Sequence, residues 1–290
     1  MTGIIRFVSS LSAALLAAAA ALAAPAAPPA APASPGAEFA RVRGDLSGKE
    51  VVYYWAGEVR GVVPGERARK LFRVEGYNIG RLVRTEDGLQ LITREVTFYE
   101  DPATGEILER WTNPYTRRDV EVVHVWNDPV NSEWPASFAL PAEDFGPDRV
   151  FSLRVYLLYP SPLPKSRFPE FAQADDYQAA ELFQFFVRKD ELADPARTSV
   201  PARISWTRIG PWLPFMRMGD RPGQMVYHCA GYKLPGGYAD LPAKVRAYVE
   251  ARGPQFRSAP ATYSEPNETS WTFFRKRLDA PSTPQAAAPK

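Results

Sequence analysis

Four basic side chains stand among apolar neighbours in segments whose residues alternate with the period of a β-strand. These residues are Arg94, His124, Arg208 and His228. Histidine titrates near neutral pH and can move a proton. Arginine can hold an anion, or a negative charge that develops during a reaction. We therefore predict catalytic roles for His124, His228, Arg208 and Arg94.

Polar side chains on buried, otherwise apolar strand faces must have partners or line a cavity. Gln184 repeats the pattern between Leu182 and Phe186. Buried polar groups are costly unless they are paired, so polar groups on several strands imply either a satisfied network or a wet cavity that holds a polar ligand. For each residue alone, a solvent-facing strand or a paired core position is the alternative. The recurrence over several strands makes a ligand site as strong an interpretation as these alternatives.

Aromatic and polar residues beside prolines, at the ends of predicted strands, could line the mouth of such a cavity. Ordinary turn chemistry is the alternative, since Asn-Pro and Asp-Pro start turns. Several carboxylates could serve as an acid or a base, but sequence separation gives no distance between them: Glu95, Glu100, Asp101, Asp128 and Glu268. The predicted ligand-binding residues are Trp111, Asn113, Trp126, Asn127, Asp128, Gln184, Trp206, Trp212, Tyr227 and Glu268.

Composition and motifs exclude several classes of function. The net charge is only +2, from 35 basic and 33 acidic residues that are interspersed, so we expect no nucleic-acid partner. Cys229 is the only cysteine and there are two histidines, which exclude an intramolecular disulfide, a cysteine-based zinc cage and a three-histidine metal site. Glycine-rich nucleotide-binding loops are absent from the sequence. We therefore expect no metal and no cofactor.

Short runs rich in Val, Tyr, Phe and Trp, separated by turn residues, dominate the middle of the chain. This pattern predicts a mainly β fold, a single antiparallel β-barrel or sandwich-like domain with one or a few short helices. One helix is predicted between a capping Asp240 and Gly253. The predicted strands are residues 50–62, 70–83, 89–99, 120–126, 150–159, 182–187, 202–208, 225–232 and 270–277.

The N-terminus has the three parts of a secretory signal: Arg6, an Ala- and Leu-rich apolar run, and small residues. We predict a signal peptide over residues 1–24, a Pro/Ala-rich linker over 25–36, one β-rich domain over 37–278 and a disordered tail over 279–290. A transmembrane anchor is the alternative, but alanine is weakly hydrophobic and no basic stop-transfer cluster follows. The expected location is therefore periplasmic or secreted, without a stable membrane anchor after cleavage.

Several motifs resemble an uncharacterised family, largely of exported bacterial proteins, catalogued as domain of unknown function 1838. They occur in order along the chain and read REVTFYEDPATGEILERWTNP, VVHVWNDPVN, PWLPFMRMGDRPGQMVYH and PNETSW. The resemblance covers about residues 52–275. It implies that residues 37–278 form one unit, but it transfers no catalytic residues.

These features favour an exported, cofactor-independent enzyme that acts on a small aromatic or apolar molecule in a β-barrel pocket. Lyase, isomerase and hydrolase chemistry all fit. A non-catalytic carrier or sensor with the same pocket is the alternative. A third interpretation treats Trp212, Phe215 and Met216 as an exposed docking patch in a Pro/Gly-rich loop. The expected partner is a small-molecule ligand or substrate, and the sequence leaves the oligomeric state open.

Overall fold

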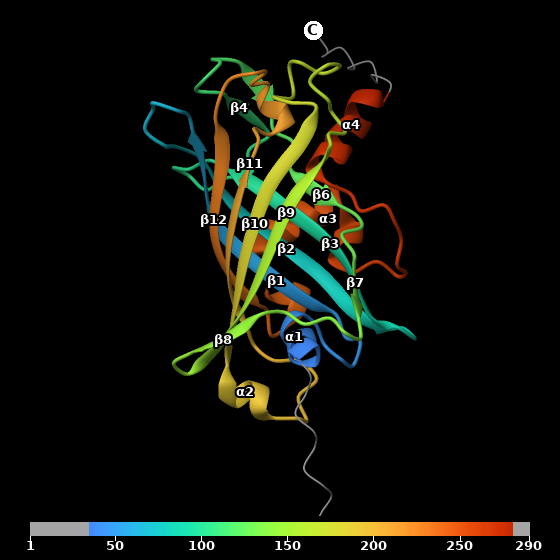
Figure 1. Cartoon of the computed structure of the whole chain (residues 1–290). Helices are drawn as coiled ribbons and strands as arrows, with labels where there is room; N and C mark the ends of the chain where they lie inside the picture. The colour runs from blue at the N-terminus through green and yellow to red at the C-terminus, as the bar shows by residue number, and fades with distance from the viewer. Residues whose placement is uncertain (1–34, 281–290) are drawn as a thin grey trace, which may run out of the picture. The chain divides into compact units, whose positions relative to one another are not determined.

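The computed structural model describes residues 35–280 and confirms a mainly β fold built around one large antiparallel sheet (Figure 1). The predictions for residues 1–24, most of the linker and most of the tail lie outside the described residues. The strands are β1 (Val51–Val62), β2 (Arg69–Arg84), β3 (Gly88–Glu100), β4 (Arg110–Thr112), β5 (Asp119–Glu121), β6 (Val125–Asn127), β7 (Ser132–Pro135), β8 (Ala142–Phe145), β9 (Asp148–Pro160), β10 (Asp176–Arg188), β11 (Arg203–Gly210) and β12 (Gln224–Lys233). The helices are α1 (Pro35–Arg43), α2 (Lys189–Ala193), η1 (Pro214–Met216), η2 (Gly237–Asp240), α3 (Ala243–Arg252), η3 (Pro254–Arg257) and α4 (Ser270–Asp279).

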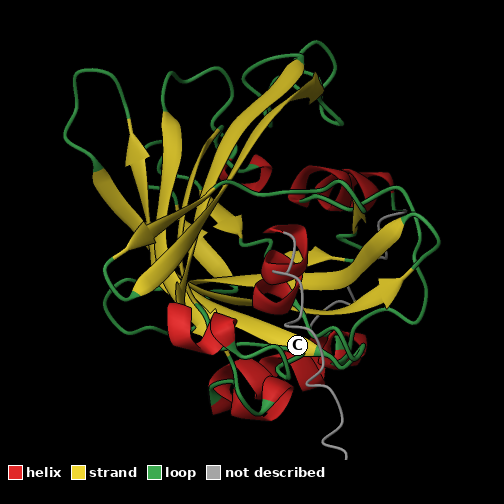
Figure 2. Cartoon of the chain, turned by 60° about the horizontal axis from the view of Figure 1, so that its bottom comes forward, coloured by secondary structure: helices red, strands yellow, loops and turns green. Residues whose placement is uncertain are grey.

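The sheet consists of two meanders joined at one seam. Its strand order is β6-β3-β2-β1-β12-β11-β10-β9-β8, with β7 also paired to β3. The seam pairs β1, the first strand, with β12, the last, from Tyr53 opposite Lys233 to Val62 opposite Gln224. Among the described strands, those near the middle of the chain (β6, β7 and β8) form the unpaired edges. Figure 2 shows the strands curving around a central region without closing on themselves.

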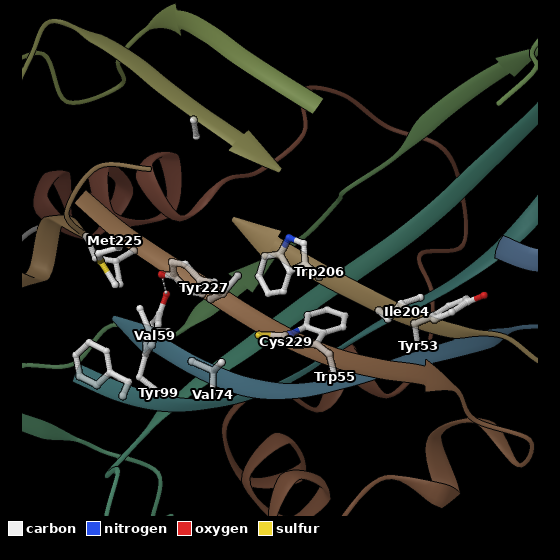
Figure 3. Close-up of a cluster of buried hydrophobic side chains, with 14 of the residues drawn as sticks. Tyr53, Trp55, Val59, Val74, Tyr99, Ile204, Trp206, Met225, Tyr227 and Cys229 are labelled. Atoms are coloured by element: carbon white, nitrogen blue, oxygen red, sulfur yellow. Dashed lines mark hydrogen bonds between the residues drawn. The ribbon is translucent and has the colours of Figure 1, made fainter. Parts of the chain in front are cut away.

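The inner face of the sheet is the one that carries Tyr53, Trp55 and Val59 of β1. Period-two alternation places every second residue on this face. Aromatic rings on this face contact one another across strands (Figure 3). The ring centroids of Trp55 and Trp206 of β11 are 5.8 Å apart, and those of Trp206 and Tyr227 of β12 are 5.7 Å apart. Cys229, the one cysteine of the sequence, is buried in the same cluster, so its thiol is not available at the surface.

The outer face of β1, β2 and β3 is covered by α3, η2 and η3. Tyr77, Val96 and Phe98 pack there against Val245 and Val249 of α3 in a second core cluster. The outer face of β9 and β10 has no comparable cover among the described residues, and large side chains such as Tyr156 and Leu158 are exposed there. The outer face of the sheet is therefore covered by helices on one half and exposed on the other.

Helix α1 fills one end of the inner face. Phe39 contacts the rings of Trp134, Phe151 and Phe185, which come from β7, β9 and β10. Lys233 of β12 donates to carbonyl oxygens of the last turn of α1 and of the residue that follows it. These contacts bring α1 between the two edges of the open sheet.

Three expectations about local structure need correction. Residues 270–277 form helix α4 and no strand, because Thr269 caps the helix through the amide of Thr272, and Trp271 and Phe274 bury one helical face. Residues 120–126 divide between β5 and β6 with an irregular stretch between them. The predicted helix near residue 243 is confirmed as α3, although its N-cap is Pro242 instead of Asp240.

Within residues 35–280, no helix has the length and apolar character needed to cross a membrane. The same residues contain no group of three or more His, Cys, Asp or Glu side chains arranged to hold a metal ion.

Candidate functional site

A cavity of about 180 Å³ lies on the inner face of the sheet. One wall comes from β3 and β6, and the opposite wall comes from β9, β10, β11 and β12. The N-terminal turn of α4 completes the lining. We call this space the inner cavity, and it is lined by Glu95, Thr97, Tyr99, Val125, Asn127, Val130, Leu157, Tyr159, Tyr177, Glu181, Trp206, Arg208, Leu213, Tyr227, Glu268, Thr269, Ser270 and Trp271.

Arg208 is the buried cation of the inner cavity, with 7% of its surface exposed. Its Nη2 donates to Tyr177 Oη at 2.6 Å, and its Nε lies 3.5 Å from a carboxylate oxygen of Glu181. The guanidinium also lies over the ring of Tyr227, 5.1 Å from the centroid. Gly210 leaves the space for this position, because a Cβ on it would come within 3.1 Å of the guanidinium nitrogens.

Three buried polar atoms that face this region have no hydrogen-bond partner among the described residues: Arg208 Nη1, Trp206 Nε1 and Asn127 Oδ1. In Figure 3 the indole nitrogen of Trp206 points away from the neighbouring ring of Trp55. Buried donors and acceptors of native proteins are almost always paired. Two donors and one acceptor therefore remain to be satisfied, and a polar ligand group can do this.

Tyrosine hydroxyls supply further polar groups to the inner cavity. Tyr99 Oη and Tyr227 Oη lie 3.1 Å apart and share a hydrogen bond. Burial raises the pKa of Tyr99 well above its usual value and that of Tyr227 to about 12. Burial likewise raises the pKa of Tyr159 to about 12. These phenols are protonated at neutral pH, so they can donate hydrogen bonds to a ligand but do not supply negative charge.

Two carboxyl groups face the cavity from opposite walls, Glu95 on β3 and Glu181 on β10. Burial, followed by the charge of Glu181, raises the pKa of Glu95 to about 7, although Arg43, Arg208 and a hydrogen bond from Asn127 oppose the shift. Glu95 therefore exchanges a proton near neutral pH, whereas Glu181 is placed to neutralise Arg208.

The N-terminus of α4 lies at the rim of the cavity, where Thr269, Ser270 and Trp271 contribute to the lining. Amide groups at a helix N-terminus carry partial positive charge and favour an anion. The ring of Trp271 lies under the guanidinium of Arg208, at 5.7 Å. The helix end and the arginine therefore add positive potential at the same part of the cavity.

The structure brings five of the sequence-predicted residues to the inner cavity. These are Asn127, Trp206, Arg208, Tyr227 and Glu268. Arg208 shares a buried face of β11 with Ile204 and Trp206, as expected for a basic residue among apolar neighbours in a strand. Strand β11 therefore supplies the centre of the site.

A second group of predicted residues lies on the outer side of the sheet, in a groove of about 490 Å³ between α3 and α4. His124, Trp126 and Asp128 line this outer groove, and Glu268 lines both sites. His124 Nδ1 accepts from the backbone amide of Tyr99 at 3.1 Å. Burial lowers the pKa of His124 to about 4, so its imidazole is neutral at pH 7.

Arg94 also faces outward, because β3 turns it with Val96 and Phe98 towards the layer of α3 and η3. It forms an ion pair of 2.8 Å with Asp128 and donates to the carbonyls of Gln255 and Ser258. These contacts hold η3 on the sheet. The described residues that line the inner cavity include neither Arg94 nor His124.

His228 and Gln184 stand on the exposed outer face of β12 and β10. His124 lies in the outer groove and His228 lies on the outer face of β12. Neither histidine is among the described residues that line the inner cavity around Arg208. The two histidines are therefore not placed to transfer a proton to a ligand in the inner cavity.

Of three further predicted residues, Trp111 packs on β2, whereas Asn113 and Trp212 stabilise the loop between β11 and β12. The ring of Trp111 packs 4.7 Å from that of Phe72. Asn113 is fully buried and donates to the carbonyl of Met216. Trp212 is buried and donates from Nε1 to the carbonyl of Arg221. Because Phe215 and Met216 are also buried, the interpretation of this loop as an exposed docking patch is wrong.

The sequence alone assigns no role to several cavity residues, namely Tyr99, Tyr159, Tyr177, Glu181 and Trp271, and it offers Glu95 only as one of five carboxylates that could act as an acid or a base. A signal was present for Glu181, which alternates with Phe183 and Phe185 on β10. The opposite set, with Leu182 and Phe186, is equally apolar, so the alternation did not identify the inner face. Tyr177 lies before the predicted strand began, and Trp271 was assigned to a strand.

These features define a class of protein: a mainly β chain with one curved antiparallel sheet and a polar cavity on its inner face. The chain belongs to the family described as protein of unknown function DUF1838, whose model matches residues 48–278. This match confirms the resemblance found in the sequence motifs and spans every strand of the sheet. A comparison with curated proteins gives no match.

Proposed function

We propose that this protein binds a small organic anion with a compact apolar body in the inner cavity. The observation that carries the proposal is the buried guanidinium of Arg208, whose Nη1 has no partner among the described residues. Trp206 Nε1, on the same strand and face, is a second unpaired donor. A carboxylate accepts from two such donors at once, and charged hydrogen bonds of this kind are among the strongest in proteins.

The size and lining of the cavity support one ring or a short branched chain as the apolar part. A volume of about 180 Å³ is close to that of apolar cavities of ~150 Å³ that bind benzene. Rings of Trp206, Tyr227 and Trp271 surround the polar centre. Large apolar ligands, such as fatty acids, exceed this volume.

We further propose that the protein is a cofactor-independent enzyme of the lyase, isomerase or hydrolase type. The sheet would then serve as an open, barrel-like wall around the substrate. Arg208 and Trp206 would hold the anionic oxygen atoms, and the phenols of Tyr99 and Tyr227 would hold a neutral oxygen. A carrier or sensor would use the same contacts for binding without a chemical step.

Export remains part of the proposal and rests on the sequence of residues 1–24. The charged start, the apolar run and the following small residues support a cleaved signal. Expression in a cell with a secretory pathway, followed by intact-mass measurement of the exported protein, tests it. A mature N-terminus after residue 23 or 24 supports export, whereas retention of the full chain in the cytoplasm contradicts it.

Titration with benzoate, followed by calorimetry, tests the binding proposal. Benzoate combines a carboxylate with one ring. Loss of a charged hydrogen bond corresponds to ~1.5–3 kcal/mol, so Arg208→Met should weaken binding by roughly 10- to 100-fold. Trp206→Phe removes the unpaired indole donor and keeps a smaller aromatic ring, and it should also weaken binding.

Arg203→Met is the matched control, because Arg203 lies on the same strand with a largely exposed side chain that pairs with Asp148. It should leave benzoate affinity unchanged. Circular dichroism of each variant establishes that the sheet is intact. Failure of the wild-type protein to bind benzoate, or equal affinity of the wild type and both cavity variants, contradicts the proposed site.

A further inference from the structure

Glu95 occupies the wall of the inner cavity opposite Arg208. Its strand, β3, places it on the inner face with Thr97 and Tyr99, and it pairs in register with Asn127 of β6. The side chain of Asn127 also acts on the Glu95 carboxyl group, whose pKa it lowers.

Charged groups reach Glu95 from three other elements. Glu181 of β10 raises its pKa, and Arg43 of α1 and Arg208 of β11 lower it, while burial is the largest effect and raises it. Tyr99 and Tyr227 face the same space as neutral phenols. The balance leaves the pKa of Glu95 at about 7, which is where a residue is most effective as both acid and base.

Other titratable groups that line the cavity are less suited to proton transfer. Glu181 is within ion-pair distance of Arg208. Glu268 is paired with Lys276 of α4. Cys229, which is buried nearby in the aromatic cluster, has its pKa raised to about 12 by burial, so it is a neutral thiol at pH 7.

Resting on the proposed binding function, we propose that Glu95 is the catalytic acid–base residue of the inner cavity. We also propose its substrate class: carboxylate-bearing ketones, such as 2-oxo acids, with a C–H group next to the carbonyl. The carboxylate binds Arg208 and Trp206, and this contact points the body of the molecule towards the opposite wall, where Glu95 stands.

The proposed step is a proton transfer that needs no further reagent. The Glu95 carboxylate takes the proton from the carbon next to the carbonyl, so a C–H bond breaks and an O–H bond forms. The electron pair of the broken bond becomes a C=C bond, and the carbonyl π pair moves onto its oxygen to give an enolate. Arg208 and the phenols of Tyr99 and Tyr227 stabilise that oxygen. The Glu95 carboxylic acid then returns a proton to the same or a conjugated carbon, which regenerates the carboxylate.

Exchange of the methylene protons of phenylpyruvate in D₂O, followed by ¹H NMR, tests this role. The wild-type protein should accelerate exchange above the buffer rate. General acid–base groups contribute ~10²–10⁴-fold, so Glu95→Gln should reduce the protein-dependent rate by at least roughly 100-fold. The same variant should still bind benzoate, because Arg208 and Trp206 are intact. Glu143→Gln, on the exposed strand β8, is the control and should retain full exchange activity.

The pH profile separates an acid–base role from a structural one. In the wild type the exchange rate should rise with pH through about 7, as the Glu95 carboxylate forms. In Glu95→Gln the residual rate should lack this inflection. Glu95→Asp keeps a carboxyl group and should recover part of the exchange rate with an inflection in its profile.

The outcomes distinguish this inference from the proposed function. If benzoate binds in an Arg208-dependent manner but exchange is absent, or is equal in wild type and Glu95→Gln, the role of Glu95 is overturned and the site belongs to a carrier. If benzoate does not bind to the wild type, the proposed function itself is overturned.

Discussion

Arg208 Nη2 donates to the hydroxyl of Tyr177 at 2.6 Å, from one strand to the next across the inner face. This bond holds one edge of the guanidinium, while Nη1 on the other side has no partner in the described chain. The arginine is thus fixed in position before a ligand arrives. Such preorganisation reduces the entropy lost on binding.

Tyr177→Phe should release this edge of the guanidinium. Loss of a hydrogen bond to a buried charged group costs ~1–3 kcal/mol, so we expect a decrease of that size in the free energy of unfolding. Benzoate affinity should fall as well, because Arg208 gains freedom. Urea denaturation and calorimetry measure the two effects. Tyr156→Phe, on the exposed face of β9, is the control, and an equal loss of stability in it would contradict the explanation.

Gly210→Ala should displace the Arg208 guanidinium, because the added Cβ lies 3.1 Å from two of its nitrogens in the present geometry. We expect benzoate to bind roughly tenfold more weakly, a change of about 1.4 kcal/mol. Ser205→Ala on the outer face of the same strand should leave the affinity unchanged. Wild-type affinity in Gly210→Ala would show that Arg208 does not hold the ligand from this position.

The stability of the protein should depend on the protonation of Glu95. Its folded-state pKa of about 7 is above its ordinary value of 4.5, mainly because it is buried. Between these pH values the unfolded chain ionises while the folded protein keeps the proton, so the wild type loses stability as pH rises.

Glu95→Gln lacks this titration, so its stability relative to the wild type should increase from pH 4.5 to pH 7 and then level off. The total change should be on the order of 3 kcal/mol, because a rise of about 2.5 in pKa corresponds to that free energy. Urea unfolding of both proteins across this pH range measures it. A difference that is independent of pH would mean that Glu95 is ionised at pH 5 in the folded protein.

The two histidines should be dispensable for benzoate binding and for phenylpyruvate exchange. His228→Gln changes an exposed residue, so the free energy of unfolding should change by less than about 0.5 kcal/mol. His124→Gln disturbs the acceptor of the Tyr99 amide, and we expect it to cost ~1–3 kcal/mol of stability. Loss of exchange in His228→Gln would return the catalytic site to the outer face of β12.

The sequence predicts the β-rich fold well where a strand has one apolar and one polar face. Strand β11 is such a case, and its inner set of Ile204, Trp206 and Arg208 follows from alternation alone. Strand β3 is different because helices cover its outer face. Both Arg94 and Glu95 then lie among buried neighbours, and alternation does not tell which of them faces the cavity.

Helix α4 was mistaken for a strand because Trp271, Phe273 and Phe274 favour β structure by type. Two local features decide for the helix: the capping interaction between Thr269 and Thr272, and the burial of residues three apart in sequence. The burial depends on contacts with residues outside the helix, such as that of Trp271 with Tyr177, which a single sequence does not contain. The sequence therefore predicts the cavity wall on β11, but at the start of α4 it predicts only Glu268.

The pairing of β1 with β12 has a consequence for how the site is assembled. Glu95 belongs to the meander that the ribosome makes first, and Arg208 belongs to the one that it makes last. The chain must be synthesised through β12, at residue 233, before the seam can form and bring the two residues onto one surface. Contacts between such distant segments slow folding, because the long loop must close before they contribute. A chain that stops before residue 224 lacks the seam strand, so a C-terminal truncation there should abolish ligand binding even though Glu95 and Arg208 are both present.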